Sequence, residues 1–189
     1  MIGNPDHHSV GLDECHIVER ARSGDADAFT ALVERYQQRL GGYLFRLPGR
    51  SDAAVDLTQE AFVRAWRALP NTQPQLHFRA WLFRIATNLV RDQFRRSQRI
   101  QWLPLETADA IVDRGAMFPS DSDDTCLRTL AQLRPRERTI LLLCAVEELA
   151  YADAATVIGV TPEAARKQFT RAKERFRRLH RAINAARTE

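Results

Sequence analysis

The sequence is poor in cysteine, glycine and lysine, and each shortage narrows the class of protein. Its three cysteines, Cys15, Cys126 and Cys144, are too few and too scattered for a disulfide framework or a CxxC zinc site, so they indicate a reducing compartment. The eight glycines form no GxxxxGK[ST] phosphate loop and no dinucleotide turn, and HExxH is absent. We therefore expect a protein that is not an enzyme and that needs no cofactor and no metal.

Long apolar runs are also missing. None approaches the roughly 20 residues that a membrane-spanning helix needs, and the start, MIGNPDHHSVGLDECH, has no basic segment followed by an apolar core. These features predict a cytoplasmic protein with no membrane contact of its own. A metal site at His7, His8, Cys15 and His16 is the alternative to the metal-free interpretation, but these residues lie in a polar N-terminal segment. Bound zinc in an elemental analysis would support it.

Charge is unevenly distributed along the 189 residues, although the net charge is only +4. Residues 78–99 hold six arginines against one aspartate, and residues 163–187 hold nine cations against two glutamates. Between these basic blocks, residues 101–125 hold six carboxylates against one arginine. Only two of the 28 cations are lysine, and arginine suits contact with phosphates and stacking on bases, although a genome rich in G and C would give the same bias.

Apolar residues recur three and four positions apart in nearly every periodic segment, and no convincing alternating strand is present. The pattern predicts an all-α protein. Periodicity fades between about 98 and 122, where Pro104, Gly115 and Pro119 are spread among acidic residues. We therefore expect two small helical domains, at 13–97 and 123–184, joined by a flexible acidic linker at 98–122.

The stretch AATVIGVTPEAARKQF has the spacing of a helix-turn-helix. Gly159 is suited to end one helix in the left-handed conformation, and Thr161 with Pro162 forms an N-cap and first-turn pair that starts the next. The start of that second helix is where a recognition helix reaches base edges in the major groove. An ordinary helical hairpin with a solvated basic face is the simpler alternative, but the basic block that follows favours DNA binding.

The stretch FRAWLFRIATNLVRDQFRR, residues 78–96, reads as one helix with two faces. Phe78, Leu82, Ile85, Ala86 and Leu89 share a face and should be core. Arg84, Asn88, Arg91 and Arg95 share another, and Trp81 lies at its border. Rings that stack on bases beside arginines that follow a backbone suit an unpaired nucleic-acid strand. Core packing of Trp81 and solvation of the arginines explain this pattern about equally well.

Taken in order, DLTQEAFVRAW (56–66), FRAWLFRIATNLVRDQFRR (78–96), LRPRERTILLL (133–143) and AYADAATVIGVTPEAARKQFTRAKERF (150–176) resemble the extracytoplasmic-function group of the sigma-70 family. RARSGDADAFTALVERY (20–36) resembles the start of region 2 of that family. Its members are bacterial RNA polymerase specificity factors without catalytic activity. The resemblance implies that the first domain is region 2, which binds polymerase and melts the minus-ten element. It also implies that the second domain is region 4, which reads the minus-thirty-five element.

The resemblance further implies site residues and partners. The clamp of core RNA polymerase would be contacted by Asp56, Gln59, Glu60, Phe62 and Trp66. The minus-ten strand would be contacted by Asn71, His77, Trp81, Arg84, Asn88, Arg91, Asp92 and Arg95. The minus-thirty-five duplex would be contacted by Thr161, Glu163, Arg166, Lys167, Thr170 and Arg171. The partners implied are core polymerase, at its clamp and flap, promoter DNA, both duplex and single-stranded, and an anti-sigma factor. The acidic linker would enter polymerase channels that otherwise hold nucleic acid.

Two alternatives stay open at this point. Large rings on a small helical lobe are usually buried, so Phe62 and Trp66 are equally consistent with core packing. The chain as a whole could instead be an autonomous helix-turn-helix regulator, which would explain the second domain but would leave residues 56–96 without a purpose. Such a regulator would bind duplex DNA without polymerase, whereas a sigma factor requires core enzyme and opens the strands.

Overall fold

The computed structural model describes residues 7–47, 53–74, 76–100 and 124–188, and within these ranges it contains helices and turns but no strand, which confirms the all-α prediction. The first group of elements, called lobe 1, comprises α1 (His7–Arg22), α2 (Ala26–Arg46), α3 (Ala54–Ala68), the 3₁₀ turn η1 (Leu69–Asn71) and α4 (Phe78–Ile100). The second, called lobe 2, comprises α5 (Asp124–Ala131), α6 (Pro135–Leu141), the π-helical turn η2 (Leu142–Val146), α7 (Tyr151–Ile158) and α8 (Pro162–Thr188). None of the helices described is long and apolar enough to cross a membrane.

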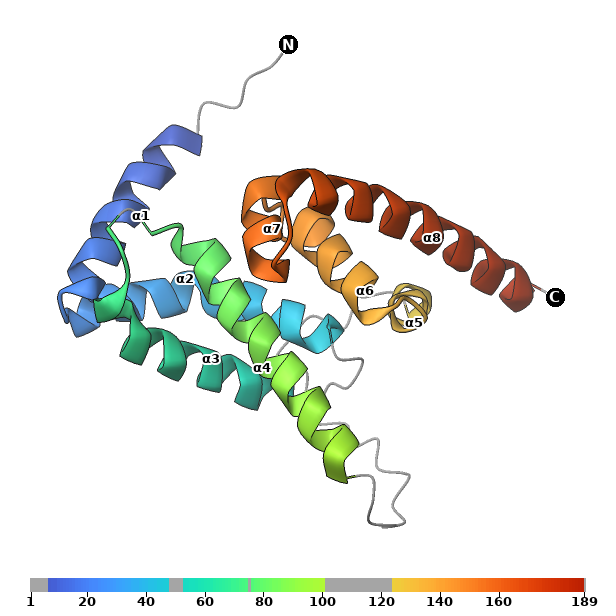
Figure 1. Ribbon diagram of the computed structural model, residues 1–189, viewed down its shortest axis with the longest axis horizontal. Coiled ribbons are helices and arrows are strands. Elements are labelled where there is room, and N and C mark those ends of the chain that lie inside the picture. The colour runs from blue at the N-terminus through green and yellow to red at the C-terminus, as the bar shows by residue number, and fades with distance from the viewer. Residues whose placement is uncertain (1–6, 48–52, 75, 101–123, 189) are drawn as a thin grey trace.

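Lobe 1 is built around α2, which α1, α3 and α4 surround (Figure 1). Asp25 caps α2, because its carboxylate accepts a hydrogen bond of 3.0 Å from the Ala28 amide and so satisfies one of the free donors of the first turn. Leu32, Leu40 and Leu44 then place a buried apolar stripe at helical spacing. This stripe forms the centre of the core of lobe 1.

Helix α4 follows the pattern expected from its sequence. Phe78, Leu82, Ala86 and Leu89 are buried, and Ile85 is half-buried. The helix continues to Ile100, past residue 98, where the linker is expected to begin. Residues 101–123, which hold most of that expected linker, lie outside the described residues.

Lobe 2 contains the helix-turn-helix, formed by α7 and α8. Gly159 adopts φ +74° and ends α7, as its sequence predicts, and the amide of Val160 donates back to the Ala155 carbonyl at 3.1 Å. Thr161 caps α8, since its hydroxyl accepts from the Ala164 amide at 3.2 Å. At 27 residues, α8 is about 40 Å long, and its C-terminal end points away from lobe 1 (Figure 1).

The two lobes pack against each other, with α7 lying against α4 (Figure 1). The contact includes a direct hydrogen bond from the guanidinium of Arg138 on α6 to the carbonyl of Leu47, the residue that follows α2, at 2.9 Å. The sequence predicted two domains but contained no indication of this contact.

Candidate polymerase and promoter interfaces

On α3, the face that points away from the core of lobe 1 carries the polar residues expected to contact the polymerase clamp. Asp56, Gln59 and Glu60 are all exposed, because they lie opposite the buried Leu57, Ala61 and Ala65 on the helix. Glu60 also forms an ion pair of 2.7 Å with Arg64, one turn further on. Three adjacent polar side chains on one rigid helix therefore form a surface available to a partner.

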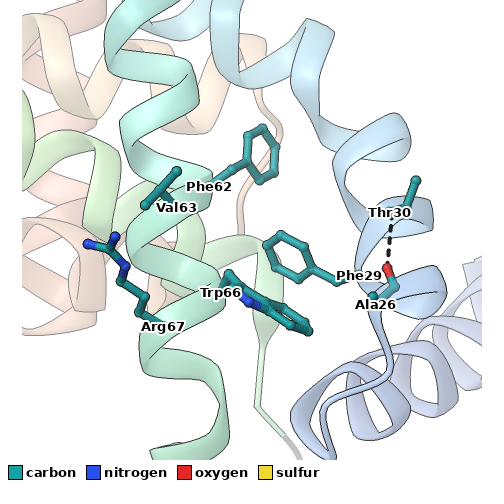
Figure 2. A pocket seen from close by; sticks show the side chains of 7 residues that line it. All are labelled: Ala26, Phe29, Thr30, Phe62, Val63, Trp66 and Arg67. Atoms are coloured by element: carbon teal, nitrogen blue, oxygen red, sulfur yellow. Dashed lines mark hydrogen bonds between the residues drawn. The ribbon is translucent and has the colours of Figure 1, made fainter.

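An apolar groove adjoins this polar face, between the start of α2 and the end of α3. Its volume is about 400 Å³. It is lined by Ala26, Phe29, Thr30, Phe62, Val63, Trp66 and Arg67 (Figure 2). The ring of Phe29 lies 4.9 Å from that of Trp66 and 6.4 Å from that of Phe62, centroid to centroid.

Both predicted aromatic contacts line the groove, but they differ in exposure. Phe62 is only 7% exposed and belongs to the core, in line with the core-packing alternative, whereas Trp66 is half-buried. Val63 is not among the residues expected from the sequence, although it is 42% exposed on the same wall. A signal for it was present, because it lies one turn beyond Gln59 and Glu60 on the exposed face.

The outer face of α4 presents most of the residues expected to contact an unpaired strand. Arg84, Asn88 and Arg95 are exposed, while Arg91 and Asp92 are half-buried. Arg95 pairs with Asp92 one turn earlier, so that carboxylate orients a cation on this face. These side chains give α4 a predominantly basic surface along about three helical turns.

Trp81 departs from the expectation that it faces outward. Its side chain is 9% exposed, and its ring centroid lies 5.8 Å from that of Phe78. The helical wheel placed Trp81 at the border between the two faces. The size of its ring and its packing on Phe78 place that border position in the interior. In this arrangement Trp81 has little surface on which a base can stack.

The segment before α4 places Asn71 and His77 at the surface of lobe 1. The ring Nδ1 of His77 lies 3.1 Å from the Asp153 carboxylate on α7. His77, which is expected to contact the minus-ten strand, thus contacts lobe 2 in this structure. Gln75, within the same segment, lies outside the described residues.

All six residues expected to read the duplex lie exposed near the start of α8, namely Thr161, Glu163, Arg166, Lys167, Thr170 and Arg171. Lys167 forms an ion pair of 2.6 Å with Glu163, which restricts the lysine side chain. On the opposite side of α8, Ala165 and Ala172 are fully buried. The helix therefore has one face fixed in the lobe and one face free for a groove of DNA.

The histidine and cysteine residues near the N-terminus show no metal-binding arrangement among the described side chains. Cys15 and His16 are exposed on α1. The side chains of His7 and His8 lie outside the described residues.

Both lobes match models of a known family. The Sigma-70 region 2 model matches residues 32–100, and the Sigma-70 region 4 model matches residues 126–176. The RNA polymerase sigma-H factor of Pseudomonas aeruginosa is 33% identical over 171 residues, which cover 84% of this chain and 89% of that protein. The ECF RNA polymerase sigma factor SigW of Bacillus subtilis is 25% identical over 85% of this chain and 93% of its own.

Solved structures have a similar fold. CnrH, determined in complex with the cytosolic domain of CnrY, has a TM-score of 0.70 and 28% identity over 89% of this chain and 97% of its own. The sigma factor RpoE of Bartonella quintana, determined with the anti-sigma factor NepR, has a TM-score of 0.68 and 22% identity over 80% of this chain and 95% of its own.

The chain therefore belongs to the sigma-70 family of RNA polymerase sigma factors, within its extracytoplasmic-function group. As a sigma factor it binds core RNA polymerase and directs promoter recognition, DNA melting and transcription initiation. The sequence-based prediction of the family and of its function is confirmed.

Proposed function

We propose that lobe 1 docks on the polymerase clamp through the exposed face of α3 and the adjoining groove. The supporting observation is their adjacency: Asp56, Gln59 and Glu60 provide polar contacts, and Trp66 with Val63 provides apolar area beside them. Protein–protein interfaces typically have an apolar core from which water is excluded and a polar, hydrated rim. A polar face beside an apolar groove fits this pattern.

The outer face of α4 is the proposed contact for the minus-ten strand. Arg84, Asn88 and Arg95 would hold an unpaired strand through its backbone and bases, together with Arg91 and Asp92. Asn71 and His77, at the surface before α4, would capture an extruded base. A stacking role for Trp81 requires that its side chain become more exposed than it is here.

The proposed contact for the minus-thirty-five duplex is the start of α8. Arg166, Lys167 and Arg171 would contact bases and phosphates, with Thr161, Glu163 and Thr170 beside them. Cations further along α8 would add sequence-independent affinity that falls as salt rises. The chain would then consist of region 2 at residues 13–97, the linker at 98–122 and region 4 at 123–184.

A protein inhibitor and the polymerase flap complete the proposed set of partners. The chain shares its fold, at 28% identity, with CnrH, which was solved bound to the cytosolic domain of a second protein. We propose that an anti-sigma factor binds this chain in a similar way. The proposed site of action is the cytoplasm, where core polymerase works, and the chain contributes no catalytic group of its own.

Transcription in vitro from genomic fragments tests this proposal. Core polymerase with the chain should give promoter-dependent transcripts and permanganate-reactive bases at the start site, and core polymerase alone should give neither. Glu60→Lys should abolish these transcripts by weakening the polymerase contact, and Arg20→Ala, on the exposed surface of α1, serves as a control. An autonomous regulator would instead protect duplex DNA without polymerase and would leave its strands closed.

A further inference from the structure

A glutamate of lobe 2 lies buried against two arginines of lobe 1. Glu147 follows η2, and its side chain is only 4% exposed. Its Oε2 lies 3.3 Å from the Nε of Arg39 on α2. Arg79 on α4 contributes to the same surroundings, and its buried Nε and Nη2 have no hydrogen-bond partner among the described residues. Lobe 1 thus forms an arginine-lined recess, and the carboxylate that enters it comes from lobe 2.

The backbone before and after Glu147 is irregular, which directs its side chain toward lobe 1. The π-helical turn η2 interrupts the α-helical pattern at Leu142–Val146, and the next residue but one, Glu148, has φ +53°. A glutamate rarely takes this left-handed conformation, which costs roughly 1–2 kcal/mol. Irregular turns of this kind persist where the surrounding structure requires them. Here the turn inserts Glu147 between the lobes and leaves Glu148 exposed.

Other polar contacts also join the described parts of the lobes. Arg138 donates to the Leu47 carbonyl at 2.9 Å, and His77 lies 3.1 Å from Asp153. Arg138 also donates to the carbonyls of Ala131 and Leu133 within lobe 2, so its loss would damage that lobe as well. His77 is largely exposed. The Glu147 carboxylate, by contrast, is buried, and its ion pair with the partly exposed Arg39 forms across the two lobes.

We propose that Glu147, seated between Arg39 and Arg79, is an intramolecular latch that holds this sigma factor in a closed, inactive arrangement. The functional part of this inference rests on the proposed promoter contacts. The minus-ten and minus-thirty-five elements are roughly 25 base pairs apart, which is about 85 Å of duplex. Lobes in direct contact cannot occupy both elements together. In the closed arrangement, moreover, His77 is engaged by Asp153.

The latch is suited to opening, because its ion pair is not strongly favourable. Burial raises the pKa of the Glu147 carboxyl even though Arg39 and Arg79 lower it, so the ionised carboxylate is held at a desolvation cost. Burial and the neighbouring Arg39 likewise lower the pKa of Arg79. Removal of the carboxylate would take a negative charge away from both arginines, of which Arg39 already lowers the pKa of Arg79. A partner that competes for either surface can therefore shift the chain toward the open state.

Small-angle X-ray scattering of the full chain, without polymerase or DNA, tests the latch. A compact chain of this length has a radius of gyration of about 16 Å, and two separated lobes should exceed about 20 Å. Glu147→Lys should produce this expansion. Combining it with Arg39→Glu should reverse most of the expansion, because the ion pair re-forms with the two charges exchanged between the lobes. Glu148→Lys, which makes the same charge change on the exposed neighbour, should stay as compact as the wild type.

The latch would be overturned if Glu147→Lys stayed as compact as the wild type or if Glu148→Lys expanded equally. Should Glu147→Lys lose its helical signal in circular dichroism, Glu147→Ala takes its place with the same expected expansion, and a compact Glu147→Ala would then reject the latch. In a second measurement, the opened variant should associate with core polymerase several-fold faster than the wild type. Failure of all variants, wild type included, to bind polymerase would reject the proposed function, while the scattering result would still decide the latch.

Discussion

The hydroxyl groups of Tyr43 on α2 and Thr87 on α4 lie 2.7 Å apart in the interior of lobe 1, where neither side chain reaches solvent. Thr87 donates its own hydrogen to the carbonyl of Phe83, so Tyr43 is the donor in this pair. Burial also raises the pKa of the Tyr43 phenol well above its usual range. The hydrogen bond therefore joins two neutral groups and fixes α4, which carries the proposed strand-binding face, relative to α2.

This pair predicts unequal effects of two conservative substitutions. Thr87→Val should destabilise the protein by about 1–3 kcal/mol, since it leaves the Tyr43 donor buried without an acceptor. Tyr43→Phe should cost about 0.5–1.5 kcal/mol, since it removes the donor itself. Urea unfolding followed by circular dichroism measures both. The double variant should be more stable than Thr87→Val alone, and strict additivity would show that the two hydroxyls do not interact.

Gly159 predicts a backbone effect free of steric conflict. A Cβ at this position would meet no atom within 4 Å, but φ +74° disfavours any residue with a Cβ. Gly159→Ala should therefore destabilise lobe 2 by about 1–2 kcal/mol. Gly159→Asn should cost less, because asparagine tolerates the left-handed region. Thermal unfolding of the two variants provides the comparison, and equal stability of Gly159→Ala and wild type would contradict the prediction.

Substitutions at the start of α8 should reduce the ability of the protein to discriminate between DNA sequences. If each side chain reads one base, Arg166→Ala with Lys167→Ala should weaken binding to a minus-thirty-five duplex by about 1–3 kcal/mol per substitution, and should relax sequence preference. Fluorescence anisotropy with matched and scrambled duplexes measures both effects. Arg177→Ala with Arg178→Ala removes the same charge further along α8 and should lower both affinities alike. Affinity for core polymerase should remain unchanged in each case.

The outer face of α4 predicts a salt-dependent effect on single-stranded DNA. If Arg84 contacts a phosphate, Arg84→Ala should reduce the slope of log affinity against log salt by about 0.7. Asn88→Ala should lower affinity without changing that slope, because the amide carries no charge. Arg20→Ala is the control, since Arg20 lies on α1 rather than α4 and pairs with Asp25 at 2.5 Å. An unchanged slope for Arg84→Ala would remove Arg84 from the proposed contact.

The cysteines predict a difference in reactivity. Burial raises the pKa of the half-buried Cys144 thiol to about 11, whereas Cys15 is exposed. Only about one Cys144 in a thousand should therefore be thiolate at pH 8, and its alkylation should accelerate about tenfold per pH unit below pH 11. Mass spectrometry after timed iodoacetamide treatment would follow each peptide. Equally rapid labelling of Cys144 and Cys15 at pH 8 would contradict the burial of Cys144.

The features that the sequence predicted well depend on chemistry within a few residues. Gly159 and Thr161 are recognisable because a left-handed stop and a hydroxyl cap act on their own helix ends. The buried face of α4 is likewise set by helical periodicity. The polar face of α3 was reached through family resemblance; its side chains are exposed in the structure, and its contact with polymerase stays a prediction.

The features that escaped prediction depend on contacts between distant segments. Trp81 lies at the edge of a helical face, so its burial depends on neighbours such as Phe78 rather than on its helical position alone. Glu147 and Arg39 are more than a hundred residues apart, and nothing near Glu147 in sequence indicates a basic recess on α2. The π-helical turn that delivers Glu147 also has no recognisable local pattern.

The hydrogen bonds of Arg138 affect how the two lobes can separate as well as how they are held together. Its guanidinium donates to one carbonyl of lobe 1 and to two carbonyls of lobe 2, so separation of the lobes removes only the first of these hydrogen bonds. The donor that is released becomes accessible to water at the same moment, which limits its desolvation penalty. When the lobes separate, the hydrogen bonds that Arg138 makes to Ala131 and Leu133 within lobe 2 can therefore remain in place.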